Sequence, residues 1–325
     1  GLYEGDDANF SFSDIYAPLD YGAVRFCEAR VWSFFNKVNP TLGEKYLPYI
    51  LGQNRERMPL WIKPSKKISY RDAQHYMRDH FEGTPLDMTK DAGAGPFSCP
   101  YRWRPLTWKV DSVEYFNERA IATQQTGFSF VAQIRDGVPT PMKGILWFGV
   151  DDAATSVYVP IYAGVKRIPE CFKVGNGDLY NFTWNSAFWM FNWVSNMAYS
   201  RYSYMIEDII PAQKELEDHF QKAVKAADVV ATDIYANNKQ EFYSYISNFS
   251  ANQSNMMMTN WKRLGEFLMV KYIDGNIKKV KDGVFVRNPY GMPDHPEQPG
   301  YSNEYYKQVV KSAGDNLKMR EVPNE

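Results

Sequence analysis

The chain has 325 residues, of which 44% are hydrophobic and 16% aromatic, so it can bury a sizeable core and is not intrinsically disordered. Its 37 Lys and Arg against 38 Asp and Glu give a formal net charge of -1, which argues against a nucleic-acid-binding protein that depends on overall basic charge. We expect no membrane-spanning helix, because the most apolar stretch, residues 184–199, is interrupted by asparagines. The 3 cysteines lie far apart, which argues against a disulfide framework and leaves the redox compartment open.

Two helices are predicted in the N-terminal part. Apolar residues recur at helical spacing over residues 20–38, and Pro40 is expected to help end this helix. We expect loops in the rest of residues 1–68. The next helix is predicted over residues 69–81, where Ser69 is followed by an aspartate at capping-box spacing.

An irregular segment and then three strands are predicted in the middle of the chain. Residues 83–107 are rich in Gly and Pro, which favours irregular structure. Runs rich in β-forming residues follow at residues 127–135, 144–150 and 156–162. The second run is apolar almost throughout, as expected of a strand buried on both faces, and Pro160 places the third at an edge or a bulge. Their close succession predicts an antiparallel meander.

Helical patterns dominate the C-terminal part. A long aromatic helix is predicted over residues 184–209, and Pro211 suits the first turn of the next helix. Residues 240–273 predict a further helix, residues 282–300 a loop and residues 305–312 a short helix. The order of helices, strands and helices predicts an α+β fold.

Familiar catalytic signatures are missing, since the sequence has no GxSxG, HExxH, P-loop or CxxC motif. Asp79, His80 and Glu82 are candidate metal ligands, but on a helix His80 points away from the other two, so we expect a solvated helix end and no metal. Each cysteine is a candidate nucleophile, which needs a nearby base or cation, but small buried core cysteines are the commoner outcome. The cysteines are Cys27, Cys99 and Cys171.

A polar segment before the first strand is a candidate binding site. Arg119 can grip a carboxylate through two parallel hydrogen bonds. Amides and hydroxyls at a strand entrance can donate to a developing oxyanion, and here they belong to Gln124, Gln125 and Thr126. The alternative is an ordinary strand start with a surface arginine.

The tryptophans suggest a second hypothesis, a stacking platform for sugars. Aromatic residues at helical spacing more often form a core, so burial of these side chains would argue against it. The tryptophans concerned are Trp103, Trp108, Trp147, Trp184, Trp189 and Trp193.

Several longer segments resemble those of one family. They are RFCEARVWSFF (25–35), RMPLWIKP (57–64), MRDHFEGTPLDMTKDAGAGPF (77–97), PYRWRPL (100–106), ERAIATQQTGFSFVAQIRDGVP (118–139), GILWFGVDDAATSVYVPIYAGV (144–165) and FTWNSAFWMFNWVSN (182–196). Together they are similar to the C-terminal part of the PepD-like cysteine-type dipeptidases, which are N-terminal-nucleophile (Ntn) hydrolases. The likeness covers more than three quarters of the chain, from about residue 10 to about residue 275.

The resemblance implies an αββα sandwich, with two antiparallel sheets face to face and helices outside, in which the strands at 127–162 are late strands. Residues 1–180 then belong to this core, and residues 181–325 form a mostly helical region that packs on it. The implied nucleophile is a cysteine at the start of the mature chain, with its own α-amine as general base and a thioester intermediate. Residue 1 is glycine, so we expect the N-terminal half that carries the nucleophile to be absent and the chain alone to be inactive.

We therefore predict the C-terminal portion of a dipeptidase that hydrolyses short peptides with no metal or other cofactor. Its expected partners are a short peptide, the N-terminal half of the same protein and a further copy of the chain, with no nucleic acid. Residues expected to line the pocket or its covering loop are Arg119, Gln124, Gln125, Thr126, His80, Glu82, Asp87 and Arg102.

Two other functions stay open on the sequence. One is a non-catalytic, aromatic-rich glycan-binding protein, and the other is a same-fold amidase that acts on penicillins or acyl-amino acids. The family resemblance favours a periplasmic or secreted location, which the residues themselves do not test.

Overall fold

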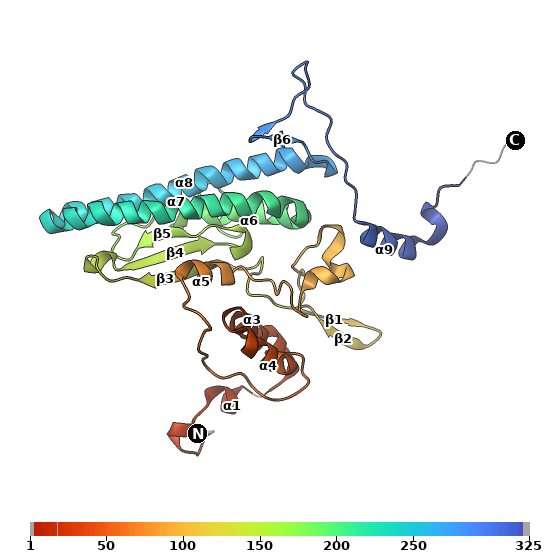
Figure 1. Cartoon of the computed structure of the whole chain (residues 1–325), viewed down its shortest axis with the longest axis horizontal. Helices are drawn as coiled ribbons and strands as arrows, with labels where there is room; N and C mark the ends of the chain where they lie inside the picture. Colours follow the sequence, from red (N-terminus) through yellow and green to blue (C-terminus); the bar gives the residue numbers. More distant parts are fainter. Residues whose placement is uncertain (1–2, 18, 321–325) are drawn as a thin grey trace. The chain divides into compact units, whose positions relative to one another are not determined.

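The computed structural model describes residues 3–17 and 19–320 (Figure 1). The chain divides into two compact units, Gly1–Leu86 with Trp103–Thr123, and Asp87–Arg102 with Gln124–Glu325. Helices predominate and the strands form small antiparallel sheets, so the predicted α+β class is confirmed. Among the described residues, no helix is both long and apolar enough to cross a bilayer.

Short helices and one hairpin make up the first unit. Its core lies between α3 and α4, where the indole N–H of Trp32 donates to the carbonyl of Gly43 at 2.8 Å. A Cβ at position 43 would collide with the side chain of Asn36, so the close approach of the two helices requires glycine. The elements are α1 (Phe12–Tyr16), α2 (Tyr21–Ala23), α3 (Ala29–Val38), α4 (Pro40–Ile50), α5 (Tyr70–Tyr76), β1 (Thr107–Val110) and β2 (Val113–Phe116).

The predicted helix over residues 20–38 is confirmed as α2, a π-helical turn (Val24–Glu28) and α3. The expectation of a single helix before residue 68 is wrong, because Pro40 begins α4. Its fixed φ and missing N–H suit a first helical turn, and the side chain of Asn39 accepts from the Leu42 N–H as a cap.

The capping box at the start of α5 is confirmed, since Ser69 and Asp72 each bond the other's backbone N–H. The helix is shorter than predicted and ends at Tyr76. Phe81, at the predicted end, is fully buried with φ 66°, a backbone conformation that no right-handed helix contains. Sequence reasoning also missed the β1–β2 hairpin, whose turn residues Asp111 and Ser112 both have positive φ.

A three-stranded antiparallel sheet with long helices forms the second unit. The strands are β3 (Phe128–Ile134), β4 (Gly144–Val150) and β5 (Val159–Tyr162), with β4 in the middle, so the predicted meander is confirmed. Pro160 lies on edge strand β5, as predicted. The helices are α6 (Ala187–Ser200), α7 (Tyr202–Asn237), α8 (Lys239–Tyr272) and α9 (Asn303–Ala313), and a small hairpin joins β6 (Val280–Lys281) to β7 (Val284–Phe285).

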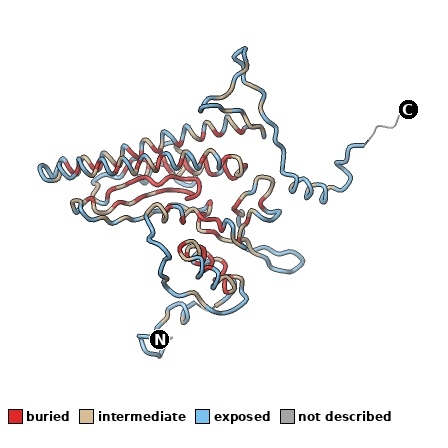
Figure 2. Tube along the Cα trace, viewed as in Figure 1, coloured by how far each residue is buried: buried red, intermediate tan, exposed pale blue. Residues whose placement is uncertain are grey.

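Burial increases across the sheet from β3 to β5 (Figure 2), and the two faces of the sheet differ sharply. One face packs against α7 and α8 and carries Trp147, which is 1% exposed, and Tyr162, which is 0% exposed. On the other face, Phe128, Phe130 and Ile134 are 60%, 49% and 79% exposed. The prediction that β4 is buried on both faces is therefore only half right, because its residues alternate between buried and half-buried up to Gly149.

The junction between α6 and α7 differs from the prediction. The break falls at Arg201, whose φ and ψ are -147° and 53°, and Pro211 lies inside α7. The buried guanidinium of Arg201 donates to the carbonyls of Tyr272, Gly275 and Asn276 at the end of α8. A tertiary contact of this kind leaves no local sequence signal.

Candidate active site

Three of the predicted pocket residues precede β3 in the second unit. Gln124 is 6% exposed and donates its amide to Oδ1 of Asn196 at 2.9 Å. Its Oε1 is buried and, among the described residues, has no hydrogen-bond partner. Gln125 is exposed and Thr126 is half-buried.

Gln124 lies at one end of a chain of hydrogen-bonded polar side chains. Asn196 donates to Oδ1 of Asn192 at 3.0 Å, and Asn192 donates to Oδ1 of Asp151 at 2.9 Å. The hydroxyl of Ser195 donates to the other oxygen of Asp151 at 2.7 Å. Both asparagines and the serine lie on α6, which therefore fixes the orientation of Gln124 from a rigid element.

Asp151 is the buried end of this chain and the most perturbed group in it. It follows β4, is 0% exposed, and holds φ at 63° with its N–H bonded to the carbonyl of Gly127. Burial raises the pKa of Asp151 to about 7, assisted by the charge of Asp152 and opposed by the hydrogen bonds from Asn192 and Ser195. A carboxyl group that titrates near neutrality is suited to proton transfer.

Sequence reasoning missed Asp151, although a signal was present. Two consecutive aspartates follow an apolar strand, a place where ionised side chains are unexpected unless they are hydrogen-bonded. Asp152 is also 0% exposed and accepts from the hydroxyl of Tyr199 at 2.7 Å. Burial, with the negative charge of Asp152, raises the pKa of Tyr199 above its ordinary range, so this hydroxyl stays protonated as a donor.

The other predicted residues of the second unit are Asp87 and Arg102. Asp87 accepts from the N–H and the hydroxyl of Thr89 at 2.9 and 2.7 Å. Arg102 donates to the carbonyl of Met88 and to the carboxylate of Asp91, both at 2.6 Å. These hydrogen bonds join residues of the irregular segment after Leu86 to one another and so stabilise its conformation.

His80, Glu82 and Arg119 belong to the first unit. His80 is buried, and its Nδ1 lies 3.2 Å from Oε1 of Glu82, so the expectations of diverging directions and a solvated helix end are wrong. Burial opposes ionisation of Glu82, but the hydrogen bonds and charge of His80 outweigh it and lower the pKa to about 2. Arg119 is half-buried. The neighbouring Glu118 forms an ion pair with Arg25 of the same unit.

The cysteines differ in their surroundings. Burial raises the pKa of Cys171 to about 12 and also raises that of Cys99, so both stay protonated thiols near neutral pH. Cys27 is exposed, in the π-helical turn. No three His, Cys, Asp or Glu side chains gather as metal ligands within residues 3–17 and 19–320.

The tryptophans of the second unit do not form the coplanar exposed row that a sugar platform needs. Trp147 is buried, and Trp184 meets Trp193 edge-on, with ring planes at 83°. Trp103 and Trp184 belong to different compact units.

Comparison with known proteins assigns the family. The model for peptidase family C69 matches residues 1–215, which include every predicted site residue. The chain belongs to peptidase family C69. The C69 match also includes Asp151 and the asparagines of α6.

Three curated relatives bear dipeptidase names. A probable dipeptidase of Salmonella dublin is 24% identical over 167 residues, which cover 51% of this C69 chain and 33% of the relative. A probable dipeptidase of Latilactobacillus sakei is 22% identical over 222 residues (68% and 41%), and dipeptidase A of Lactobacillus helveticus is 20% identical over 221 residues (67% and 38%). The chain thus spans about a third to two fifths of the length of the curated relatives that it matches.

Proposed function

We propose that this protein takes part in the hydrolysis of dipeptides by a cysteine-nucleophile mechanism. The observation that carries the proposal is the C69 match over residues 1–215, together with relatives that bear the name dipeptidase. Membership of a peptidase family makes hydrolysis of a peptide bond plausible, and the dipeptidase names specify a short substrate.

The finer fold that we propose is the αββα sandwich. The uncovered apolar face of the β3–β4–β5 sheet supports it, because Phe128, Phe130 and Ile134 would lose contact with water if a second sheet packed on them. We place residues 1–180 in that core and residues 181–325 in a helical region on its outside. The second sheet would be supplied by polypeptide other than these 325 residues.

The nucleophile is proposed to be a cysteine outside this sequence. Cys99 and Cys171 do not favour the thiolate form, and the relatives extend well beyond the part that they share with this chain. The attack would place negative charge on the peptide oxygen, which needs hydrogen-bond donors aimed at it. Gln125 and Thr126, at the entrance to β3, are proposed as such donors.

Two further contacts with substrate are proposed. Gln124, held by Asn196, presents a free buried oxygen that suits the ammonium group or an amide N–H of a peptide. Arg119 is proposed to bind the free carboxylate that distinguishes a dipeptide from the interior of a longer chain. His80, Glu82, Asp87 and Arg102 are proposed to shape the segments around the pocket.

The test is release of amino acids from L-leucyl-L-leucine, measured by chromatography. The product of the complete native gene should release leucine, whereas the 325-residue chain alone should not. N-acetyl-L-leucyl-L-leucine amide, which lacks both charged ends, serves as the control substrate. The proposal fails if the complete gene product releases no amino acid from a panel of dipeptides between pH 5 and 9.

A further inference from the structure

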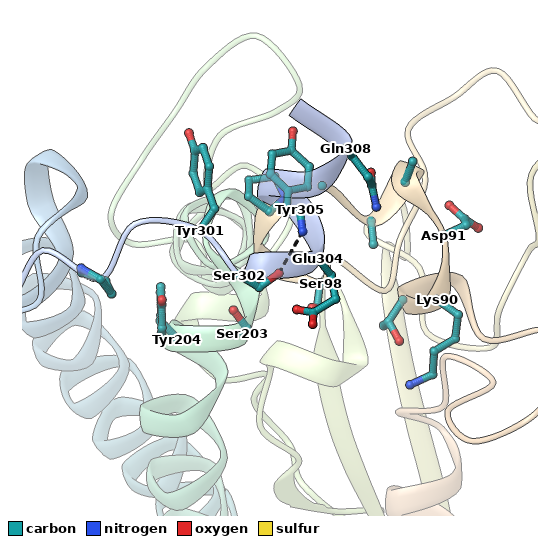
Figure 3. A pocket seen from close by; sticks show the side chains of 16 residues that line it. Lys90, Asp91, Ser98, Ser203, Tyr204, Tyr301, Ser302, Glu304, Tyr305 and Gln308 are labelled. Atoms are coloured by element: carbon teal, nitrogen blue, oxygen red, sulfur yellow. Dashed lines mark hydrogen bonds between the residues drawn. The ribbon is translucent and has the colours of Figure 1, made fainter. Parts of the chain in front are cut away.

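A pocket of about 660 Å³ lies within the second unit (Figure 3). One wall comes from Thr89–Ser98 and from Ser203 and Tyr204 at the start of α7, and the other from Pro299 and residues 301–308 around the start of α9. The second wall lies beyond residue 215, where the match to C69 ends. The family match therefore covers one wall of this pocket and not the other.

The pocket carries opposite charges on its two walls. Lys90 has a side chain that is 74% exposed and sits 3.8 Å from Asp87, at the outer limit of an ion pair, so its ammonium can turn to a ligand. Glu304, in the first turn of α9, forms no ion pair with any residue that the structure describes. Asp91 also lines the pocket, but Arg102 neutralises it at 2.6 Å. Figure 3 shows Lys90 and Glu304 on different sides of the pocket.

The remaining lining suits the same kind of ligand. Tyr301 makes edge-on contacts with the rings of Phe97 and Tyr305, at centroid distances of 5.9 and 5.2 Å, and aromatic faces attract an ammonium group. On the opposite wall the hydroxyl of Ser98 can donate to a carboxylate, whereas that of Thr89 already donates to Asp87 at 2.7 Å. A sphere of the pocket's volume is about 11 Å across, whereas two extended residues span about 7 Å, so a dipeptide fits whole.

We propose that this pocket binds the zwitterionic form of a short peptide or amino acid, with Lys90 on the α-carboxylate and Glu304 on the α-ammonium. The choice of peptides as the ligand class rests on the proposed function; the need for two opposite charges rests on the pocket. A dipeptide substrate and its amino-acid product share this chemistry.

Isothermal titration of the whole chain with L-leucyl-L-leucine and with L-leucine tests the proposal and separates the two sources. Binding identifies the ligand, and the Lys90 and Glu304 variants described next assign it to this pocket rather than to the substrate contacts proposed for Gln124 and Arg119. The C-terminal amide and the N-acetyl derivative of the bound compound should each bind at least tenfold more weakly, which corresponds to about 1.4 kcal/mol. Mass spectrometry after titration checks that the peptide is intact.

Substitutions then assign each charge to one end of the ligand. Lys90→Gln should remove the preference for the free carboxylate over the amide, and Glu304→Gln the preference for the free ammonium over the acetylated form. Matched controls are Lys262→Gln and Glu266→Gln, an exposed pair on α8 with N and O atoms 4.0 Å apart, which should change neither preference.

Three results would overturn the proposal: no binding of either compound at millimolar concentration, equal binding of charged and blocked ends, or unchanged preferences in both pocket variants. These results are independent of turnover. If the complete gene product hydrolyses dipeptides but this pocket binds none, the dipeptidase proposal stands and the pocket proposal fails. If the pocket binds a ligand but the complete gene product hydrolyses no dipeptide, the pocket proposal stands and the dipeptidase proposal fails.

Discussion

Replacing Asp151 by asparagine should stabilise the protein at alkaline pH. Asparagine tolerates the positive φ of 63° at this position, and its oxygen can still accept from Asn192. Its amide can donate to the hydroxyl of Ser195, which then donates to the Asn192 carbonyl, 3.2 Å away. The substitution therefore removes a buried charge and keeps the surrounding hydrogen bonds.

The magnitude follows from the pKa shift. The ordinary pKa of an aspartate is 3.8, and burial raises that of Asp151 to about 7 in the folded chain. The folded state therefore holds a proton that the unfolded state releases between about pH 4 and pH 7, so stability falls as pH rises through this window. Three units at 1.36 kcal/mol each give a loss of about 4 kcal/mol, fully present above pH 7.

Urea unfolding of the wild type and of Asp151→Asn at pH 4.5, 6 and 8 measures this loss. We expect the variant to gain up to about 4 kcal/mol over the wild type at pH 8 and only about 1 kcal/mol at pH 4.5, where the unfolded carboxyl group is already mostly ionised. Asp136→Asn is the control, because that carboxylate is fully exposed and its replacement should leave the pH dependence unchanged. A stability difference that is the same at all three pH values would refute the burial argument.

Three shorter predictions follow from other residues. In the active complete protein, Arg119→Ala should lower kcat/KM for a dipeptide by a factor that corresponds to about 1.5–3 kcal/mol, and should leave kcat/KM for the C-terminal amide of that dipeptide unchanged. Equal slowing of both substrates would exclude carboxylate binding. Trp147→Ala should cost about 3–5 kcal/mol of unfolding free energy, because the side chain is fully enclosed, whereas Trp108→Ala on the exposed hairpin should cost far less. At pH 7.5 a thiol reagent should modify the exposed Cys27 at least tenfold faster than the buried Cys171, and equal rates would contradict the structure.

Local features of the fold could be predicted where the sequence itself contains the cause. The bounds of β4 match the predicted apolar run, and the capping box at Ser69 forms as its spacing indicates. Pro40 was misjudged because proline ends one helix and begins another equally well. The break at Arg201 could not be predicted, since its acceptors lie more than 70 residues later in the chain.

The candidate site was predictable only in part for a similar reason. Gln124 could be selected from its position before a strand, but its partner Asn196 lies 72 residues away on α6. Asp151 draws its raised pKa from burial, which depends on packing that periodicity does not reveal. That Arg119 and Thr126 line the same pocket remains a prediction, because the boundary between the two compact units falls between them.

The Arg201 contacts have a consequence for synthesis of the chain on the ribosome. The corner between α6 and α7 cannot gain its hydrogen-bond acceptors until Tyr272, Gly275 and Asn276 have been made and α8 has folded back. In a nascent chain released before residue 272, the guanidinium of Arg201 would lie against Phe97 and Tyr204 without these carbonyl oxygens to accept its hydrogen bonds. Premature termination within α8 should therefore yield products that quality-control proteases remove, rather than shorter stable versions of the second unit.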